Sequence, residues 1–217
     1  MHRLTQPLPN CYLLLFKNQK DLAMTFCRVQ EFYESDKPEL KGKFFTFADF
    51  IESQMDKNGN IHYFDTWDGF NVPGHIFKEW LSNLDETTRY ENELLKVVNT
   101  SVEQFYIIGA LEKDKATINH EIAHALFYIV EDYKIEMSKL NDEFKKQYKG
   151  QYNKLVKELK KMGYAEDVLF DEIQAYMSTS KNSDLVDYFA LNTELLKPLI
   201  TQYKKVLRKY NTYNHKA

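Results

Sequence analysis

The 217 residues suffice for one large domain or two small ones, and a hydrophobic fraction of 43% suffices for a core. The 29 basic and 32 acidic side chains nearly balance, which gives no reason to expect nucleic acid as a partner. No stretch reaches the roughly 18 apolar residues of a membrane span. The two cysteines, Cys11 and Cys27, lie outside any metal-binding spacing and are typical of reduced thiols. Because the start has no signal-peptide pattern, we expect a soluble, cytoplasmic protein. The same sequence is also compatible with delivery of the protein into another cell.

The first hundred residues alternate between strand-like and helical patterns, with too few Gly and Pro residues to mark a linker. In chain order we expect a buried strand at 11–16, helices at 21–35 and 45–55, a β-like segment at 61–64, an irregular loop at 65–74, helices at 73–84 and 87–98, and a strand at 105–110. The last is the clearest strand candidate, because it is short, apolar and partly β-branched.

From residue 115 the pattern is helical to the end of the chain. Apolar residues recur with a 3.6-residue period over 115–130, 133–162, 165–179 and 184–210, with breaks at Gly150, Gly163 and 182–183. The sequence therefore predicts an α+β fold, with a few-stranded sheet in the N-terminal half and a helical C-terminal half. We expect the N-terminal part, 1–100, to complete a cleft on the helical part, 101–217.

The run His120-Glu121-Ile122-Ala123-His124 carries the clearest chemical signal. Two histidines four positions apart lie on one face of a helix, so that both imidazoles can reach a single zinc ion. Glu121 lies about 100° further round the helix. Its carboxylate can there serve as the general base for a zinc-bound water without binding the metal itself.

The surroundings favour this interpretation over coincidence, which would give such a spacing in about one chain per hundred of this length. The predicted helix 115–130 is apolar nearly all round, which indicates burial. Two buried histidines and a glutamate are costly unless a metal satisfies them. The strand expected at 105–110 lies just upstream, where an extended segment can pair with a substrate backbone by strand addition.

The run 120–124 resembles the zinc-binding helix of the zincin metallopeptidases. The resemblance implies a zincin-like fold, one Zn²⁺ per chain, and hydrolysis of peptide bonds in a protein or peptide substrate. The metzincin branch needs a glycine and a third histidine where this chain has Phe127 and Val130. The aspzincin signature is also not visible. The gluzincin branch, in which a glutamate from a later helix is the third ligand, fits this chain.

Two adjacent carboxylates, Asp171 and Glu172, are candidates for the third ligand, and Glu172 follows His124 by 48 residues. The residues at 168, 169, 175 and 176, one turn before and after Glu172, are apolar or aromatic, so Glu172 faces inward. Asp171 shares a more polar arc with Asp167 and Gln174. We therefore expect Glu172 to bind the metal, with Asp171 as the alternative.

Gluzincin-like enzymes often place a tyrosine or histidine where it stabilises the oxyanion opposite the base. Tyr164, eight residues before Glu172, resembles the upstream tyrosine of some toxin-type members. We expect Tyr164 to fill this role, with Tyr176, one turn after Glu172, as the alternative.

Other functions stay open. One is a catalytically silent zinc-binding or regulatory module with a zincin-like fold, although a silent site has no use for the carboxylate of Glu121. A non-peptide amidase such as a peptide deformylase is disfavoured, because its glutamine and cysteine motifs are missing. A protease that acts on a single substrate inside a cell is compatible with the small size.

Several other patterns favour ordinary structural roles. His62 and His75 flank the loop around Trp67 and are typical of surface or hydrogen-bonded histidines. We expect Trp67, Phe70 and Trp80 to anchor this loop to the core or, if they are exposed together, to form a binding surface for a substrate or partner. The lysine-rich stretch 134–161 also contains acidic residues and a narrow apolar stripe, which indicates a solvated helical hairpin.

Overall fold

The computed structural model describes residues 2–35 and 37–213, and it divides into two compact units, Met1–Ile118 and Asn119–Ala217. The division falls inside helix α5 (Lys115–Ile129), well beyond residue 100. All four strands belong to the first unit, and the second is helical, so the fold is α+β as expected. Within the described ranges, no helix is long and apolar enough to cross a membrane.

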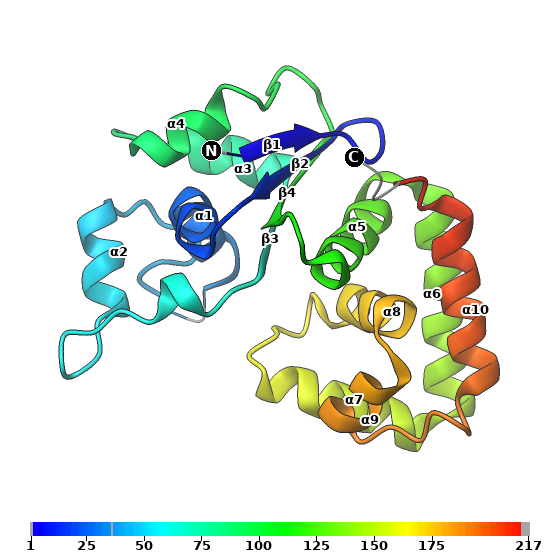
Figure 1. Ribbon diagram of the computed structural model, residues 1–217. Coiled ribbons are helices and arrows are strands. Elements are labelled where there is room, and N and C mark those ends of the chain that lie inside the picture. Colours follow the sequence, from blue (N-terminus) through cyan, green and yellow to red (C-terminus); the bar gives the residue numbers. More distant parts are fainter. Residues whose placement is uncertain (1, 36, 214–217) are drawn as a thin grey trace. The chain divides into compact units, whose positions relative to one another are not determined.

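A four-stranded mixed sheet forms the centre of the first unit, in the order β1-β2-β4-β3 (Figure 1). The predicted strand β2 (Cys11–Phe16) pairs in parallel with β4 (Tyr106–Leu111). β1 (His2–Thr5) runs antiparallel to β2, and β3 (Gly69–Pro73) runs antiparallel to β4. Every side chain of β2 is buried, as its continuous apolar sequence predicts.

Helix α1 (Gln19–Glu34) packs against the sheet. Its N-cap is Asn18, whose side chain accepts a hydrogen bond from the backbone N–H of Asp21. Phe26 of α1 lies directly on Gly109 of β4, where a Cβ would overlap the phenylalanine ring. The close contact between helix and sheet therefore depends on a residue without a side chain.

Three further helices and one 3₁₀ turn complete the first unit: α2 (Phe47–Gln54), η1 (Tyr63–Asp65), α3 (Gly74–Ser82) and α4 (Arg89–Leu95). At the start of α4, Thr88 and Glu91 form a capping box. Glu91 also accepts two hydrogen bonds of 2.7 Å from Arg28 of α1, and both side chains are almost fully buried. This ion pair ties α4 to α1.

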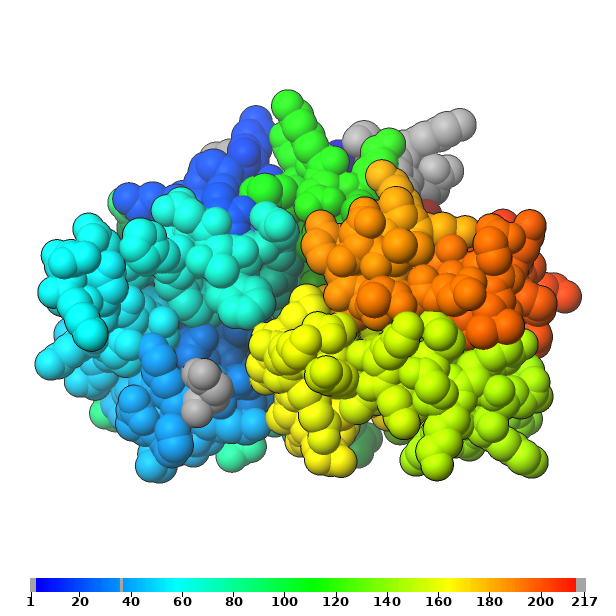
Figure 2. Space-filling view, turned by 90° about the horizontal axis from the view of Figure 1, so that it is seen from below, coloured from blue at the N-terminus to red at the C-terminus, as the bar shows by residue number. Residues whose placement is uncertain are grey.

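The second unit contains, after α5, the helices α6 (Glu131–Gln147), α7 (Lys149–Lys161), α8 (Leu169–Thr179), α9 (Asn182–Phe189) and α10 (Lys197–Tyr210). α8 packs against α6, α7 and α10 (Figure 1), while α7 and α9, yellow and orange in Figure 2, contribute to the surface. The buried Asn141 of α6 donates to the carbonyl oxygen of Phe170 at 2.6 Å and accepts from the hydroxyl of Tyr203 at 2.7 Å. These bonds fix α8 between α6 and α10.

Two strands escaped the sequence prediction. β1 was not foreseen, and β3 lies in what the sequence predicts as an irregular loop. The β-like segment expected at 61–64 is wrong, because Ile61 makes only an isolated bridge to Met55 before the chain turns into η1. Both missed strands lie at the edges of the sheet. β1 has only four residues, and β3 has a glycine and a proline at its ends, so neither shows a clear strand pattern.

The expectation that the strand at 105–110 can pair with a substrate is also wrong. β4 lies inside the sheet, where Ile107 is opposite Tyr12 of β2 on one side and Val72 of β3 on the other. Both backbone edges of β4 are therefore used within the sheet.

The single helix expected at 184–210 consists of two helices. α9 ends at Phe189 and is capped by Ala190, a left-handed residue with a φ of 51°, and α10 starts only at Lys197 with Pro198 in its first turn. The break expected at 182–183 is in fact the start of α9.

Several histidine, aromatic and cysteine side chains of the first unit differ in how far they are exposed. The side chain of His62 is 78% exposed and Trp67 is 47% exposed. Phe70 and Trp80 lie in the core as expected, whereas Trp67 does not anchor the loop there. Cys11 and Cys27 are buried and free, and burial raises the pKa of both thiols.

Candidate metal centre

Helix α5 carries the histidine motif into the interior of the second unit. All side chains from position 121 to 126 are buried, with Glu121 7% and His124 2% exposed. The apolar residues between and after the two histidines account for this burial. The helix therefore holds ionisable groups where each needs a partner.

Three side chains from α5 and α8 converge on one point. Nε2 of His120 lies 3.2 Å from Nε2 of His124. Oε1 of Glu172 lies 3.5 Å from Nε2 of His124, and Oε2 lies 3.7 Å from Nε2 of His120. The ligand atoms of the three residues lie within 4.8 Å of one another, so this group could hold a metal ion.

Hydrogen bonds on the far side of each ring turn the two Nε2 atoms toward this point. Nδ1 of His124 lies 3.0 Å from Oδ2 of Asp171, to which it donates. The hydroxyl of Thr179 donates to the carbonyl oxygen of Ala175 at 2.7 Å, so its oxygen accepts from Nδ1 of His120 at 3.3 Å. We therefore assign the proton of each neutral ring to Nδ1, which leaves a lone pair on each Nε2.

Glu172, rather than Asp171, is the carboxylate that has an oxygen without a hydrogen bond. Oδ1 of Asp171 accepts from Nε2 of Gln174 at 2.7 Å, and Oδ2 accepts from His124. By contrast, Glu172 is 7% exposed and its Oε2 is buried without a hydrogen-bond partner. Such an oxygen is costly unless a cation meets it. The structure thus places Glu172 in the metal group and Asp171 behind His124.

The carboxylates around the two histidines favour a positive charge between them. Burial opposes the protonation of His124, but the carboxylates of Asp171 and Glu172 outweigh it and raise the pKa of His124 well above its usual range. Burial likewise opposes the ionisation of Glu172, but His124 and His120 lower its pKa overall. A proton on His124 meets this need in the metal-free protein, and a metal ion would replace that proton while binding all three side chains.

Two tyrosines lie beside the metal group. The hydroxyls of Tyr164 and Tyr176 are 3.1 Å apart, and the ring of Tyr176 lies edge-on to His120 with centroids 4.7 Å apart. Burial raises the pKa of Tyr164 beyond its usual range and that of Tyr176 to about 12, and the charges of Glu172 and Glu121 add to both effects. Both hydroxyls therefore stay protonated at neutral pH and can donate hydrogen bonds.

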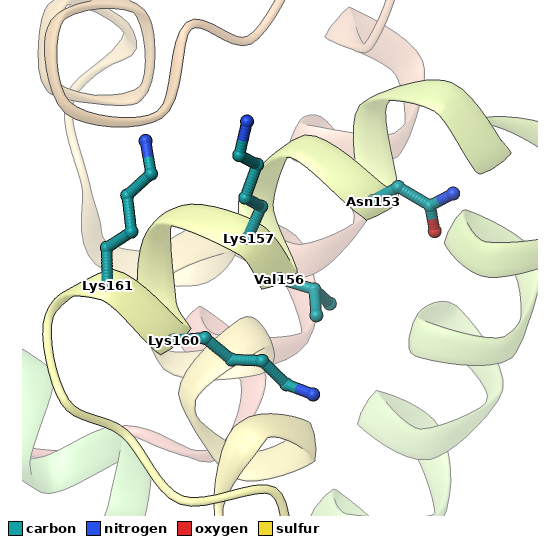
Figure 3. Close-up of a pocket in the computed structure, with 5 residues that line it drawn as sticks. All are labelled: Asn153, Val156, Lys157, Lys160 and Lys161. Atoms are coloured by element: carbon teal, nitrogen blue, oxygen red, sulfur yellow. The ribbon is translucent and has the colours of Figure 1, made fainter.

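A shallow depression of about 520 Å³ along α7 is a separate feature, lined by Asn153, Val156, Lys157, Lys160 and Lys161 (Figure 3). Lys160 and Lys161 already pair with Glu166 and Glu158. None of the lining residues belongs to the metal group. The depression is part of the lysine-rich helical segment that the sequence predicts to be solvated.

Two further residues of the centre, Thr179 and Gln174, were not predicted as such from the sequence. Thr179 follows Glu172 by seven positions, or two helical turns, which places both on the same face of α8. Gln174 follows Asp171 by three positions and shares its side of the helix. These spacings are signals that could have found both residues once Glu172 was chosen.

Comparisons with protein-family models, with curated proteins and with solved structures gave no match to this chain. The case for a function therefore depends on the chemistry of the metal centre itself.

Proposed function

We propose that this chain is a zinc-dependent metallopeptidase with a zincin-like fold and a gluzincin-type centre. The observation that carries the proposal is the convergence of His120, His124 and Glu172 immediately beside Glu121. The two Nε2 atoms are 3.2 Å apart, Oε1 of Glu172 lies 3.5 Å from His124 and Oε2 lies 3.7 Å from His120, and one ligand atom from each residue can be chosen within 4.8 Å of the others. Ligand atoms around a tetrahedral zinc ion lie about 3.3–3.6 Å apart, given zinc–ligand distances of about 2.0–2.2 Å. Three protein ligands are also typical of catalytic zinc, which keeps a fourth position open.

The residues around the centre suit hydrolysis of a peptide bond. A bound zinc ion would polarise the substrate carbonyl and lower the pKa of water. Glu121 would take a proton from the attacking water and pass it to the leaving amine. Tyr164, kept protonated by its surroundings, would donate to the carbonyl oxygen as negative charge grows there, with Tyr176 holding its hydroxyl in place.

The second candidate function is a catalytically silent zinc-binding or regulatory module with the same fold. One observation favours it: β4, the strand expected to receive a substrate, has both edges paired within the sheet. Zinc binding alone therefore does not separate the two functions, and a test of catalysis is needed.

The metal is tested first, by elemental analysis of the dialysed wild type, His124→Ala and Glu172→Ala. We expect about one zinc per wild-type chain, lost or loosened in both variants. A folded wild type that contains no zinc and does not bind added zinc would refute the metallopeptidase and the zinc-binding module, and would leave only a regulatory or interaction module without metal.

Catalysis is tested with Glu121→Gln, which keeps the three ligands. The variant should retain its zinc and lose cleavage of a mixed peptide library, detected by mass spectrometry, by a factor of about 100 or more. Glu131→Gln, an exposed residue on α6, is the matched control and should cleave like the wild type. Cleavage by Glu121→Gln at the wild-type rate would contradict the assigned base. A zinc-loaded wild type that cleaves no peptide would favour the silent module.

A further inference from the structure

We propose that Gln174 and Tyr133 are positioning residues of the metal centre, which hold Asp171 so that it orients His124 and does not itself bind the metal. The inference rests on the proposed function, because it assigns these residues a role in zinc binding.

A continuous chain of hydrogen bonds links the two residues to the metal group. The hydroxyl of Tyr133 donates to Oε1 of Gln174 at 2.8 Å, and Nε2 of Gln174 donates to Oδ1 of Asp171 at 2.7 Å. Oδ2 of Asp171 then accepts from Nδ1 of His124 at 3.0 Å. The chain runs from α6 through α8 to α5. Tyr133 and Gln174 are completely buried, so water does not compete for these bonds.

The orientation of the Gln174 amide is fixed by three partners. Its oxygen accepts from Tyr133, while its nitrogen donates to Asp171 and lies 3.4 Å from the carbonyl oxygen of Ala123. The reverse orientation would turn the amide oxygen toward a carboxylate and a carbonyl, which offer no proton. The carboxylate of Asp171 and the carbonyl of Ala123 thus keep the donor end of the amide facing Asp171, and Tyr133 holds the opposite end in place.

The amide matters because Asp171 is the least enclosed member of the chain. Its side chain is 29% exposed, whereas that of His124 is 3% exposed. If Gln174 did not hold Oδ1, the carboxylate would be free to turn toward water and release His124. It would also be free to compete with its neighbour Glu172 for the metal. Gln174 therefore separates the roles of two adjacent carboxylates, one as ligand and the other as partner of a ligand.

The test is the dissociation constant of zinc, measured by competition with a chromophoric chelator on folded protein. Gln174→Met keeps the length of the side chain and removes all three hydrogen bonds of the amide, so it should weaken zinc binding by about 10-fold, the lower end for lost partners of metal ligands. Tyr133→Phe should weaken it by a smaller factor. Because it removes a single oxygen from the core, it also serves if Gln174→Met does not fold.

Asn141→Leu is the matched control. Asn141 is likewise a completely buried amide that contacts α8, but it bonds to Phe170 and Tyr203 and not to Asp171. Its loss should lower the stability of the protein and leave the zinc affinity of the folded chain unchanged. Weakening of zinc by Asn141→Leu as large as that by Gln174→Met would overturn the proposal, since general loosening of α8 would then explain both.

A double variant separates positioning from other effects. Asp171→Asn should weaken zinc by about 10- to 100-fold, and adding Gln174→Met to it should change little further, because both act through His124. Additive losses, or wild-type affinity in both Gln174→Met and Tyr133→Phe, would overturn the positioning role while the metal site stands. A wild type that binds no zinc would instead overturn the proposed function and, with it, this inference.

Discussion

The substitution Glu172→Gln offers the most direct test of the metal centre through protein stability. It preserves the shape of a side chain that is 9% exposed and removes its negative charge. Glu166→Gln is the matched control, because the side chain of Glu166 is 86% exposed and pairs only with Lys160 at the surface. Both variants lose one carboxylate, but only Glu172 belongs to the metal group.

The expected magnitude follows from linkage between binding and folding. A ligand at about 100 times its dissociation constant stabilises the folded state by about 2.7 kcal/mol. For a chain of this size, about 2–4 °C per kcal/mol gives a rise in the midpoint of roughly 5–11 °C. If Glu172→Gln weakens zinc by about 100-fold, the same free zinc gives only about 0.4 kcal/mol. The corresponding rise is about 1–2 °C.

The assay is thermal unfolding followed by circular dichroism, at one buffered concentration of free zinc and in its absence. The wild type and Glu166→Gln should show the full zinc-dependent rise, and Glu172→Gln only a small part of it. A full rise in Glu172→Gln would refute the assignment of Glu172 as a ligand. An equal reduction in Glu166→Gln would show that the effect arises from overall charge rather than from the site.

Three further predictions concern charged groups. Zinc must displace a proton from His124, whose pKa is raised, so zinc affinity should increase as the pH rises above about 6.5; competition titrations across this range check it, and a flat affinity would contradict it. In the metal-free protein the raised pKa of His124 stabilises the fold fully below about pH 6.5, and this contribution declines as the pH rises through the pKa of the folded state. The lowered pKa of Glu172 contributes stability that is lost as the pH falls through the pKa of Glu172 in the folded state. Arg28→Met leaves the carboxylate of Glu91 buried without its ion pair and should lower the free energy of unfolding by about 3–5 kcal/mol in urea titrations. Adding Glu91→Leu should restore part of that loss, and no recovery would argue against an uncompensated charge as the cause.

The elements that the sequence predicts well are those whose signal is local. β2 has a continuous apolar run and is buried throughout. The motif on α5 has its two histidines one turn apart. The boundary between α9 and α10 was missed even though Pro198 marks a helix start, because leucines keep a helical period across it. The interior position of β4 could not be predicted, because it depends on pairing with β3, whose own sequence is typical of a loop.

The metal group shows a similar division between local and distant information. The spacing of the motif predicts which two histidines approach each other, and apolar neighbours predict that Glu172 faces inward. The sequence places Gln174 beside Asp171 on α8, but it does not show that Tyr133, 41 residues earlier on another helix, binds the opposite end of the same amide. Contacts of this kind arise only when α6 and α8 pack together.

Helix α8 therefore contributes as much to the centre as the helix that carries the motif. It supplies the third candidate ligand, Glu172, and it also holds both histidine rings from behind, through Asp171 and Thr179. A rotation of α8 by one residue, about 100°, would break all of these contacts together. Buried polar side chains on such a helix lower stability relative to apolar ones unless each is matched. Among the described side chains of α8, Oε2 of Glu172 is the one buried oxygen without a hydrogen bond, and it lies 3.7 Å from Nε2 of His120, where we propose that zinc binds.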